Sequence, residues 1–377
     1  MLPPVDDFPE AASPKPAPRN GRNALARVAP LCQARPMTHF DIVRVDPSNQ
    51  ALVESWLTAQ ESVQAHDFTG LSPWNPLGAL AGLVVPDPDV RRERWAAVCD
   101  GAVLGYLGLH LSDRDNTHLA NFEIGVRPES RRHGVGSALL RHAEERAAEE
   151  GRTTISTWLA VPHEDSPDVR GDGGPFLIDK GYKRSLEAAV RVCELATVLD
   201  EDLDRLWEES WAKAEGFELA VFHGEPPAHL IDGVAYLHAR MYTDMPLGDW
   251  DLQEGRITAD TVRLWERQRL LRGVLNIQSA VVHKESGEVA GLTEIHVRAG
   301  DERHCLQGDT IVDPRFRGHR LGTILKIANQ RRLQSMRPWM RYVWTGNAES
   351  NTHMIAINEA VGYRLAGHET VFQKRLG

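Results

Sequence analysis

The chain has 377 residues, of which 42% are hydrophobic and 25% charged, and its formal net charge is −10. This length is too great for one ordinary domain and sufficient for two, and the composition is that of a globular protein with a substantial core. No apolar run approaches the about 20 residues of a membrane-spanning helix, and the negative charge argues against nucleic acid as a partner, because backbone phosphates require a basic surface.

The cysteines give no sign of a metal site or a disulfide framework. The four of them, Cys32, Cys99, Cys193 and Cys305, are widely spaced, without a CxxC pair or histidines at ligand spacing. This usage fits a reducing compartment, so we expect a cytoplasmic protein without a metal ion. We further expect a monomer or homodimer that has no membrane partner.

Taken in order, the first half begins with residues 1–37, whose eight prolines and lack of apolar periodicity predict a disordered tail. Next the pattern predicts a strand at 40–45, a helix at 48–66 and a loop with short helical pieces at 70–90. A hairpin turning at Asp100-Gly101 follows, then a strand ending at Pro128 and a helix that Gly151 ends. The half closes with a strand at 153–161, and a short helix and strand within 176–195.

The second half repeats this order. An acidic amphipathic helix at 199–216 is expected to link the halves. After it we predict a strand at 217–224, helices within 226–245 and 257–273, and Thr258 as a helix cap. A hairpin at Ser286-Gly287, a strand at 304–314, a helix to about Met336, and strand, helix and strand elements within 341–376 complete the pattern.

The halves also match residue by residue. Residues 123–140 align without a gap with residues 309–326, and the offset is constant, as 317 − 131 = 186 shows for two arginines. This repeat predicts a duplicated domain. We therefore expect an α+β protein of two tandem domains, each a mostly antiparallel sheet flanked by helices: a tail at 1–37, a first domain at 38–198, a linker helix at 199–216 and a second domain at 217–377.

Each aligned stretch is a strand that enters a helix through a turn of small or basic residues. Such a junction directs backbone N–H groups and the positive end of a helix dipole toward one point. We call residues 131–137 and 317–323 the first and second anion turns, because this geometry suits a phosphate or pyrophosphate.

With Arg131, Gly134 and Gly136, the first anion turn and its flanking elements resemble the GNAT superfamily of acyl-CoA-dependent N-acyltransferases. The second departs from the Arg-x-x-Gly-x-Gly pattern because Arg320 replaces the first glycine. Downstream, Asn351 and Gly362-Tyr363 resemble the coenzyme-contacting end of the family, although Asn358 stands where a tyrosine often protonates the leaving thiolate. The first half keeps the glycine-tyrosine pair as Gly181-Tyr182. Arg170 stands at its position for the asparagine, and Leu177 at its position for the proton-donating tyrosine. The tandem arrangement is similar to that of the mycothiol-synthase-like double-domain proteins of actinobacteria.

The resemblance implies acetyl-CoA as co-substrate and a strand that splays from its neighbour, so that a main-chain N–H can polarise the thioester carbonyl. The residues it assigns to the coenzyme in the second half are Ile311, Val312, Arg317, Gly318, His319, Arg320, Leu321, Gly322, Thr323 and Asn351. Those in the first half are Val126, Arg131, Arg132, His133, Gly134, Val135, Gly136 and Ser137. Arg320 could still offer its N–H and pair with phosphate.

The catalytic base is expected to be a carboxylate on a central strand. The candidates are Asp309 and Glu294 in the second half and Glu123 in the first. Alternatively, Asp309 and Glu123 are solvated residues at strand ends, and Glu294 forms an outward-facing salt bridge. The second half is the expected catalytic one, the opposite assignment remains open, and no residue can be named as the general acid.

These observations favour an acetyl-CoA-dependent N-acetyltransferase whose small-molecule primary amine attacks directly in a ternary complex. One alternative is mycothiol-synthase-like acetylation of a cysteinyl sugar. Another is a protein that binds or senses acetyl-CoA without catalysis.

Overall fold

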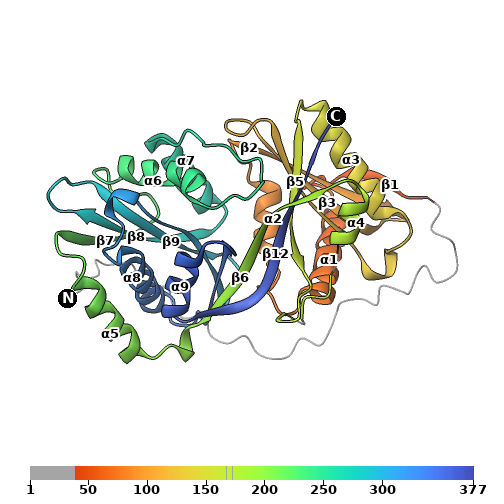
Figure 1. The fold of residues 1–377 in the computed structure, drawn as a ribbon. Coiled ribbons are helices and arrows are strands. Elements are labelled where there is room, and N and C mark those ends of the chain that lie inside the picture. Colours follow the sequence, from red (N-terminus) through yellow and green to blue (C-terminus); the bar gives the residue numbers. More distant parts are fainter. Residues whose placement is uncertain (1–38, 167, 172) are drawn as a thin grey trace. The chain divides into compact units, whose positions relative to one another are not determined.

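Strands from both halves of the chain form one continuous sheet (Figure 1). The structure is a computed structural model, and it describes residues 39–166, 168–171 and 173–377. The predicted tail at 1–37 lies outside the described residues. None of the described helices is both long and apolar enough to cross a membrane.

Both halves contain the predicted succession of elements. The first half consists of β1 (Asp41–Arg44), α1 (Gln50–Asp67), α2 (Pro76–Val84), β2 (Val90–Cys99), β3 (Ala102–Ser112), β4 (Leu119–Val126), η1 (Pro128–Ser130), α3 (Val135–Glu149), β5 (Thr154–Val161), α4 (Gly174–Asp179), β6 (Lys183–Glu194) and η2 (Leu195–Thr197). The second consists of α5 (Asp200–Trp211), β7 (Phe217–His223), α6 (Ile231–Asp244), α7 (Ala259–Leu271), β8 (Val274–His283), β9 (Val289–Arg298), β10 (His304–Val312), η3 (Pro314–Phe316), α8 (Leu321–Met336), β11 (Tyr342–Ala348), α9 (Thr352–Ala360) and β12 (Tyr363–Arg375).

Local signals explain where several elements begin and end. The side chain of Asn49 accepts a hydrogen bond from the Leu52 N–H at the start of α1, and Thr258 does the same for the Thr261 N–H in α7, as predicted for Thr258. Asp100 and Gly101 have φ values of 50° and 78°, which is the geometry of the two-residue turn expected between β2 and β3. The predicted α+β class with two tandem domains is confirmed.

The two halves exchange their last strands. The sheet order is β1-β2-β3-β4-β5-β12-β6-β11-β10-β9-β8-β7, so β12 of the second half pairs with β5 of the first, and β6 of the first half pairs with β11 of the second. Figure 1 shows β12, drawn in blue, running beside β5. The domain boundaries expected from the sequence stay a prediction, since this ladder crosses them.

The parallel pair in each half separates part-way along. Pairing between β4 and β5 is limited to Leu119–Asn121, and pairing between β10 and β11 to His304–Leu306, although both β4 and β10 continue for several residues. The splayed strands implied by the family resemblance are therefore present in both halves.

Equivalent glycines let a helix lie close to the sheet in each half. A Cβ added at Gly105 would lie 3.2 Å from Leu139 Cδ1, and one at Gly291 would lie 3.0 Å from Leu325 Cδ1. The leucines are related by the same offset as the glycines, since 325 − 139 = 291 − 105 = 186. Both sites require glycine because α3 and α8 approach the central strands closely.

The acidic helix α5 packs on α8. Its Glu209 accepts a hydrogen bond from Arg320 Nη1 at 3.1 Å, and the Arg331 guanidinium of α8 lies 5.1 Å from the Trp207 ring centroid. The residue range that was predicted to link the halves therefore also covers a helix of the second half.

One charged residue of α8 lies in the core. Lys326 is 1% exposed, its Nζ lies 5.1 Å from the Tyr363 ring centroid, and the equivalent position in the first half is Leu140. Burial lowers the pKa of the Lys326 ammonium to about 7. The folded protein therefore holds this proton less tightly than the unfolded chain does.

We expect Lys326→Leu to stabilise the protein, since an apolar side chain needs no solvation at this site. Below pH 7 the lysine is charged in both states and the burial penalty is largest. Between about pH 7 and 10.5 only the unfolded state holds the proton, so wild-type stability rises toward that of the variant. Urea unfolding at pH 6 and pH 9.5 should give a stability difference that shrinks by roughly a few kcal/mol. A pH-independent difference would contradict this account.

Candidate active site

The two anion turns have the same backbone path although their glycines differ. Positive φ values occur at Arg132 (65°) and Gly134 (84°) in the first turn, and at Gly318 (90°) and Arg320 (56°) in the second. These positions are equivalent, since 318 − 132 = 320 − 134 = 186. Each turn thus holds one glycine and one arginine in the left-handed region, and the replacement at Arg320 leaves the path unchanged.

Equivalent arginines brace the two turns. Arg131 Nε donates to the Val126 carbonyl at 3.0 Å, and its Nη2 lies 2.6 Å from the buried Asp67 carboxylate at the end of α1. In the second half, Arg317 Nε donates to the Val312 carbonyl at 3.2 Å, and its Nη2 lies 3.0 Å from Asp244 at the end of α6. These guanidinium groups hold the strand, turn and preceding helix together.

The anion-binding capacity of the turns therefore lies mainly in their main chain. α3 begins at Val135 and α8 at Leu321, and N–H groups of a first helical turn generally have no acceptor within the helix. In α8 the Thr323 N–H is an exception, because it donates to the Arg320 carbonyl at 3.1 Å. The side chains of Leu321 and Thr323 are buried, and His319 Nδ1 lies 3.0 Å from the Lys213 carbonyl. The predicted coenzyme residue Asn351 uses its side-chain oxygen to cap α9, accepting from Met354 N–H at 3.2 Å.

β10 carries an irregularity that β4 lacks. Its pairing with β9 shifts between Gln307 and Thr310, whereas β3 and β4 keep a regular register through Glu123. A β-bulge redirects side chains and frees main-chain groups, and it is a common feature beside active sites. Asp309 lies within this bulge.

Asp309 meets two other titratable side chains in the second half. His238 Nδ1 of α6 lies 3.3 Å from Asp309 Oδ2, and the ligand atoms of His238, Glu294 and Asp309 all lie within 4.8 Å of one another. Arg269 Nη1 of α7 lies 3.5 Å from Glu294 Oε2 and supplies a positive charge at this cluster. The structure thus brings together two of the carboxylates named from the sequence as candidate bases, whereas the sequence gave no sign of His238, on a helix 71 residues away.

Burial and neighbouring charges act in opposite directions on these groups. Burial lowers the pKa of His238, but its hydrogen bond to Asp309 and the charges of Glu294 and Asp309 outweigh burial, so that the pKa of His238 is raised. Burial raises the pKa of Glu294, yet Arg269 and His296 lower it well below the ordinary value. Glu294 is 2% exposed, so the outward salt bridge is excluded, and its low pKa makes it a weaker base than expected.

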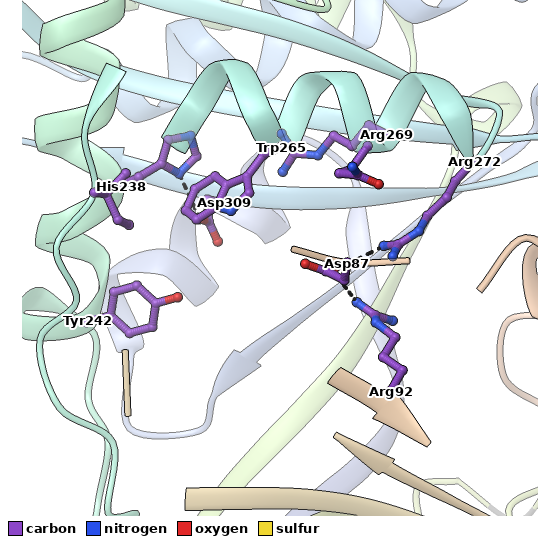
Figure 2. A pocket seen from close by; sticks show the side chains of 10 residues that line it. Asp87, Arg92, His238, Tyr242, Trp265, Arg269, Arg272 and Asp309 are labelled. Carbon is purple, nitrogen blue, oxygen red and sulfur yellow. Dashed lines mark hydrogen bonds and ion pairs between the residues drawn. The ribbon is translucent and has the colours of Figure 1, made fainter. Parts of the chain in front are cut away.

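A cavity of about 320 Å³ opens at this cluster (Figure 2). His238, Tyr242 and Asp309 lie on one side, Trp265 and Arg269 of α7 line another, and Asp87 lies between Arg92 and Arg272 on the far side. Asp87 and Arg92 belong to the first half. The sequence could not indicate this wall, because both residues occur in segments without any motif.

The third catalytic candidate, Glu123, lies elsewhere. It is exposed and lines a separate cavity of about 540 Å³, whose other lining residues include Gln64, Trp158, Leu306, Gln307, Trp344 and Glu369. The splayed ends of both parallel pairs contribute to this space. It is roomy enough for the acyl arm of a coenzyme in either half.

Two groups of side chains among the described residues have a spacing that would suit a metal ion. One is the cluster at Asp309, and in the other the ligand atoms of His163, Asp165 and His368 lie within 4.8 Å of one another, with His163 and Asp165 exposed. At Asp309, the Arg269 guanidinium already provides the charge that a cation would bring. The expectation of a metal-free protein stays a prediction.

Comparison with known proteins relates this architecture to acetyltransferases. Residues 54–169 match the family "Acetyltransferase (GNAT) family". The mycothiol acetyltransferase of Amycolatopsis mediterranei is 29% identical over 289 residues, covering 74% of this chain and 83% of that protein. The mycothiol acetyltransferase of Geodermatophilus obscurus is 28% identical over 341 residues, covering 86% of this chain and 93% of that protein.

Solved structures agree with the tandem arrangement. A tandem GNAT protein from the clavulanic acid biosynthesis pathway superposes with a TM-score of 0.72 and 26% identity, covering 90% of this chain and 99% of that one. A GCN5-related N-acetyltransferase from Sphaerobacter thermophilus superposes with a TM-score of 0.59 at 17% identity, covering 89% and 96% of the two chains, and this likeness concerns the fold alone.

The left-handed conformation of Arg320 leads to a test of the second anion turn. Replacement by glycine should stabilise the protein by about 1 kcal/mol relative to Arg320→Ala, because only glycine adopts this backbone without strain. Both variants lose the exposed ion pair with Glu209, which contributes little, so their comparison isolates the backbone effect. Equal midpoints of thermal unfolding for the glycine and alanine variants would show that the turn has a different conformation.

Proposed function

Because the chain is of the tandem GNAT type, an acyltransferase architecture whose family uses acetyl-CoA, we propose that it transfers an acetyl group from acetyl-CoA to the primary amine of a small molecule, with catalysis in the second half. The observation that carries this proposal is the bulge of β10, which brings Asp309 beside His238 at a cavity. In the first half β4 is regular and its Glu123 is exposed.

In this proposal the His238–Asp309 pair takes the proton from the attacking ammonium group. The pKa of His238 is raised above its ordinary value, which makes the imidazole a stronger proton acceptor than a free histidine. The free amine nitrogen forms a bond to the thioester carbonyl carbon, and the carbon–sulfur bond breaks with its electron pair going to sulfur. Coenzyme A leaves as the thiolate, and the second proton lost by the nitrogen balances its protonation to the free thiol. Main-chain N–H groups at the β10 bulge would stabilise the developing oxyanion.

The coenzyme would lie with its pyrophosphate at an anion turn. Gly134 and Gly318 have open space at the position of a Cβ atom, so a ligand can approach the main chain closely there. The same feature supports coenzyme binding at both turns. We propose that the first half binds acetyl-CoA without turnover and serves the second.

A second candidate is acetylation of a cysteinyl sugar, the mycothiol-type reaction. It is favoured by the two actinobacterial relatives, which are named mycothiol acetyltransferases and align over most of their length. The chemistry at the amine would be the same. A direct assay with the cysteinyl sugar and with simple amines separates the two.

Substitution of the last glycine of each anion turn tests which half is catalytic. We expect Gly136→Glu to remove acetyl-CoA binding in the first half only, because the new carboxylate repels the pyrophosphate. Gly322→Glu should remove binding in the second half and, with it, acetyl transfer. Isothermal titration calorimetry with acetyl-CoA and a product assay by mass spectrometry would measure both effects.

The matched control for these variants is Gly82→Glu in α2, where a Cβ atom has no neighbour within 4 Å. It should bind and react like the wild type. Loss of turnover in Gly136→Glu with full activity in Gly322→Glu would assign catalysis to the first half.

A pH profile tests the proposed base. The wild-type kcat/KM should rise with pH through an apparent pKa above 6.5, the ordinary value for histidine. In Asp309→Asn burial still lowers the pKa of His238 and Glu294 still raises it, but the hydrogen bond to Asp309 and the charge of Asp309 no longer raise it, so the rising limb of the pH profile should move to lower pH. The variant's rate should fall by about 10²- to 10⁴-fold.

Asp232→Asn is a suitable control, because Asp232 is an exposed acid of the same helix as His238. A wild-type profile retained by Asp309→Asn would exclude the His238–Asp309 pair as the base.

A further inference from the structure

The cavity of about 320 Å³ has two ends of opposite charge (Figure 2). At one end Asp309 lies with the buried carboxylates of Glu294 and Glu266. Arg269 pairs with both of these glutamates and is the arginine nearest to them. At the other end two guanidinium groups, Arg92 and Arg272, share the single carboxylate of Asp87, with distances of 3.0 and 3.4 Å.

The arginine end has unused hydrogen-bonding capacity. A guanidinium carries five N–H donors. Arg92 donates to Asp87, and Arg272 donates to Asp87 and, at 3.2 Å, to the Val85 carbonyl. Within the described residues, Nε of both arginines is buried without an acceptor. An anionic group at this end would supply acceptors that the protein itself does not.

Neighbouring groups respond to the excess positive charge at this end. Burial and the charge of Arg92 lower the pKa of the Arg272 guanidinium, against the effect of Asp87. Burial and the charges of Arg94, Arg92 and Arg272 lower the pKa of His110 to about 3, so this histidine is neutral at physiological pH. A bound anion would relieve the repulsion between these arginines.

We infer that the acceptor is a small zwitterion, with its primary amine at Asp309 and His238 and an anionic group, a carboxylate or a phosphate, at Arg92 and Arg272. Arginine is suited to both anions because its planar fork donates two parallel hydrogen bonds. The inference rests on the proposed function and narrows its substrate class. It makes the first half part of the acceptor site, since Arg92 lies on β2 and Arg272 follows α7.

The test compares acceptors that differ only in the anionic group. ω-Amino acids of two to six carbons are assayed beside their methyl esters, and O-phosphoethanolamine beside ethanolamine, with acetyl-CoA. We expect at least one anionic member to have a KM at least about tenfold lower than its neutral partner, as one charge-assisted pair contributes. The carboxylate and phosphate series show which anion is preferred.

Variants then locate the effect. Arg92→Gln and Arg272→Gln, in different halves of the chain, should each raise the KM of the anionic acceptor about tenfold or more and leave that of its neutral partner unchanged. Arg91→Gln on β2 and Arg263→Gln on α7 are matched controls, because both arginines pair with exposed or half-exposed acids outside the cavity. Melting temperatures confirm that each variant is folded.

The inference and the proposed function fail in different ways. If no amine is acetylated, the proposed function fails. Calorimetric titration of the protein with the same charged and neutral probes would still show whether the cavity prefers the anionic members, as the inference requires. Equal affinity for charged and neutral partners, no binding of any anionic probe, or a preference that survives Arg92→Gln and Arg272→Gln would overturn it.

Discussion

The antiparallel ladder between β6 and β12 is the constraint on which the rest of the structure depends. These strands are the last of their halves, and each also pairs with the other half, so one sheet passes through both. Side chains add to this connection, as in the hydrogen bonds of Asn75 with Asp301 at 2.6 Å and of Trp265 with Asp89 at 3.2 Å. A cavity with walls from both halves requires such a fixed relation, because hinge motion would separate Arg92 from Asp309.

Duplication supplied the scaffold, and substitution at equivalent positions made the halves different. Gly108 and Glu294 are equivalent, since 294 − 108 = 186. In the first half a Cβ atom at Gly108 would lie 2.5 Å from Glu123 Oε1, so the Glu123 side chain covers the glycine. In the second half Glu294 itself occupies this position and stands beside Asp309. Among the described residues, equivalent elements therefore bring two carboxylates together in the second half, where the first half has a glycine and Glu123.

The sequence predicted the fold well because its strongest signals are local. Periodicity, the Asp100-Gly101 turn, the Thr258 cap and the constant offset of 186 each depend on neighbours in the chain or on the repeated stretch in the other half.

The candidate site was predicted only in part. Asp309 and Glu294 lie on adjacent strands of one hairpin-linked sheet, so their proximity follows from β-pairing. His238 and Arg272 reach the site through helix packing, and Asp87 and Arg92 through packing between halves, which no local pattern encodes. The low pKa of Glu294, a residue of β9, likewise depends on Arg269 of α7.

The two anion contacts that we propose for this protein involve different groups, main-chain N–H groups at the anion turns and arginine side chains at the cavity. Arg131 and Arg317 are the conspicuous basic residues of the anion turns, yet each is held by an aspartate and a strand carbonyl. Asp67 pairs with Arg131, whereas Asp244 pairs with both Arg317 and Arg240. In both turns the guanidinium group is held against the protein, which leaves main-chain N–H groups to contact the coenzyme proposed there. Arg92 and Arg272 have one carboxylate between them, so their charge remains available. In the proposed function, main-chain donors would contact the diphosphate common to every acyl-CoA, and side chains could change without disturbing the turn. On this proposal, substitutions around Asp87 would alter the acceptor and leave coenzyme binding unchanged, as expected where one fold serves many substrates.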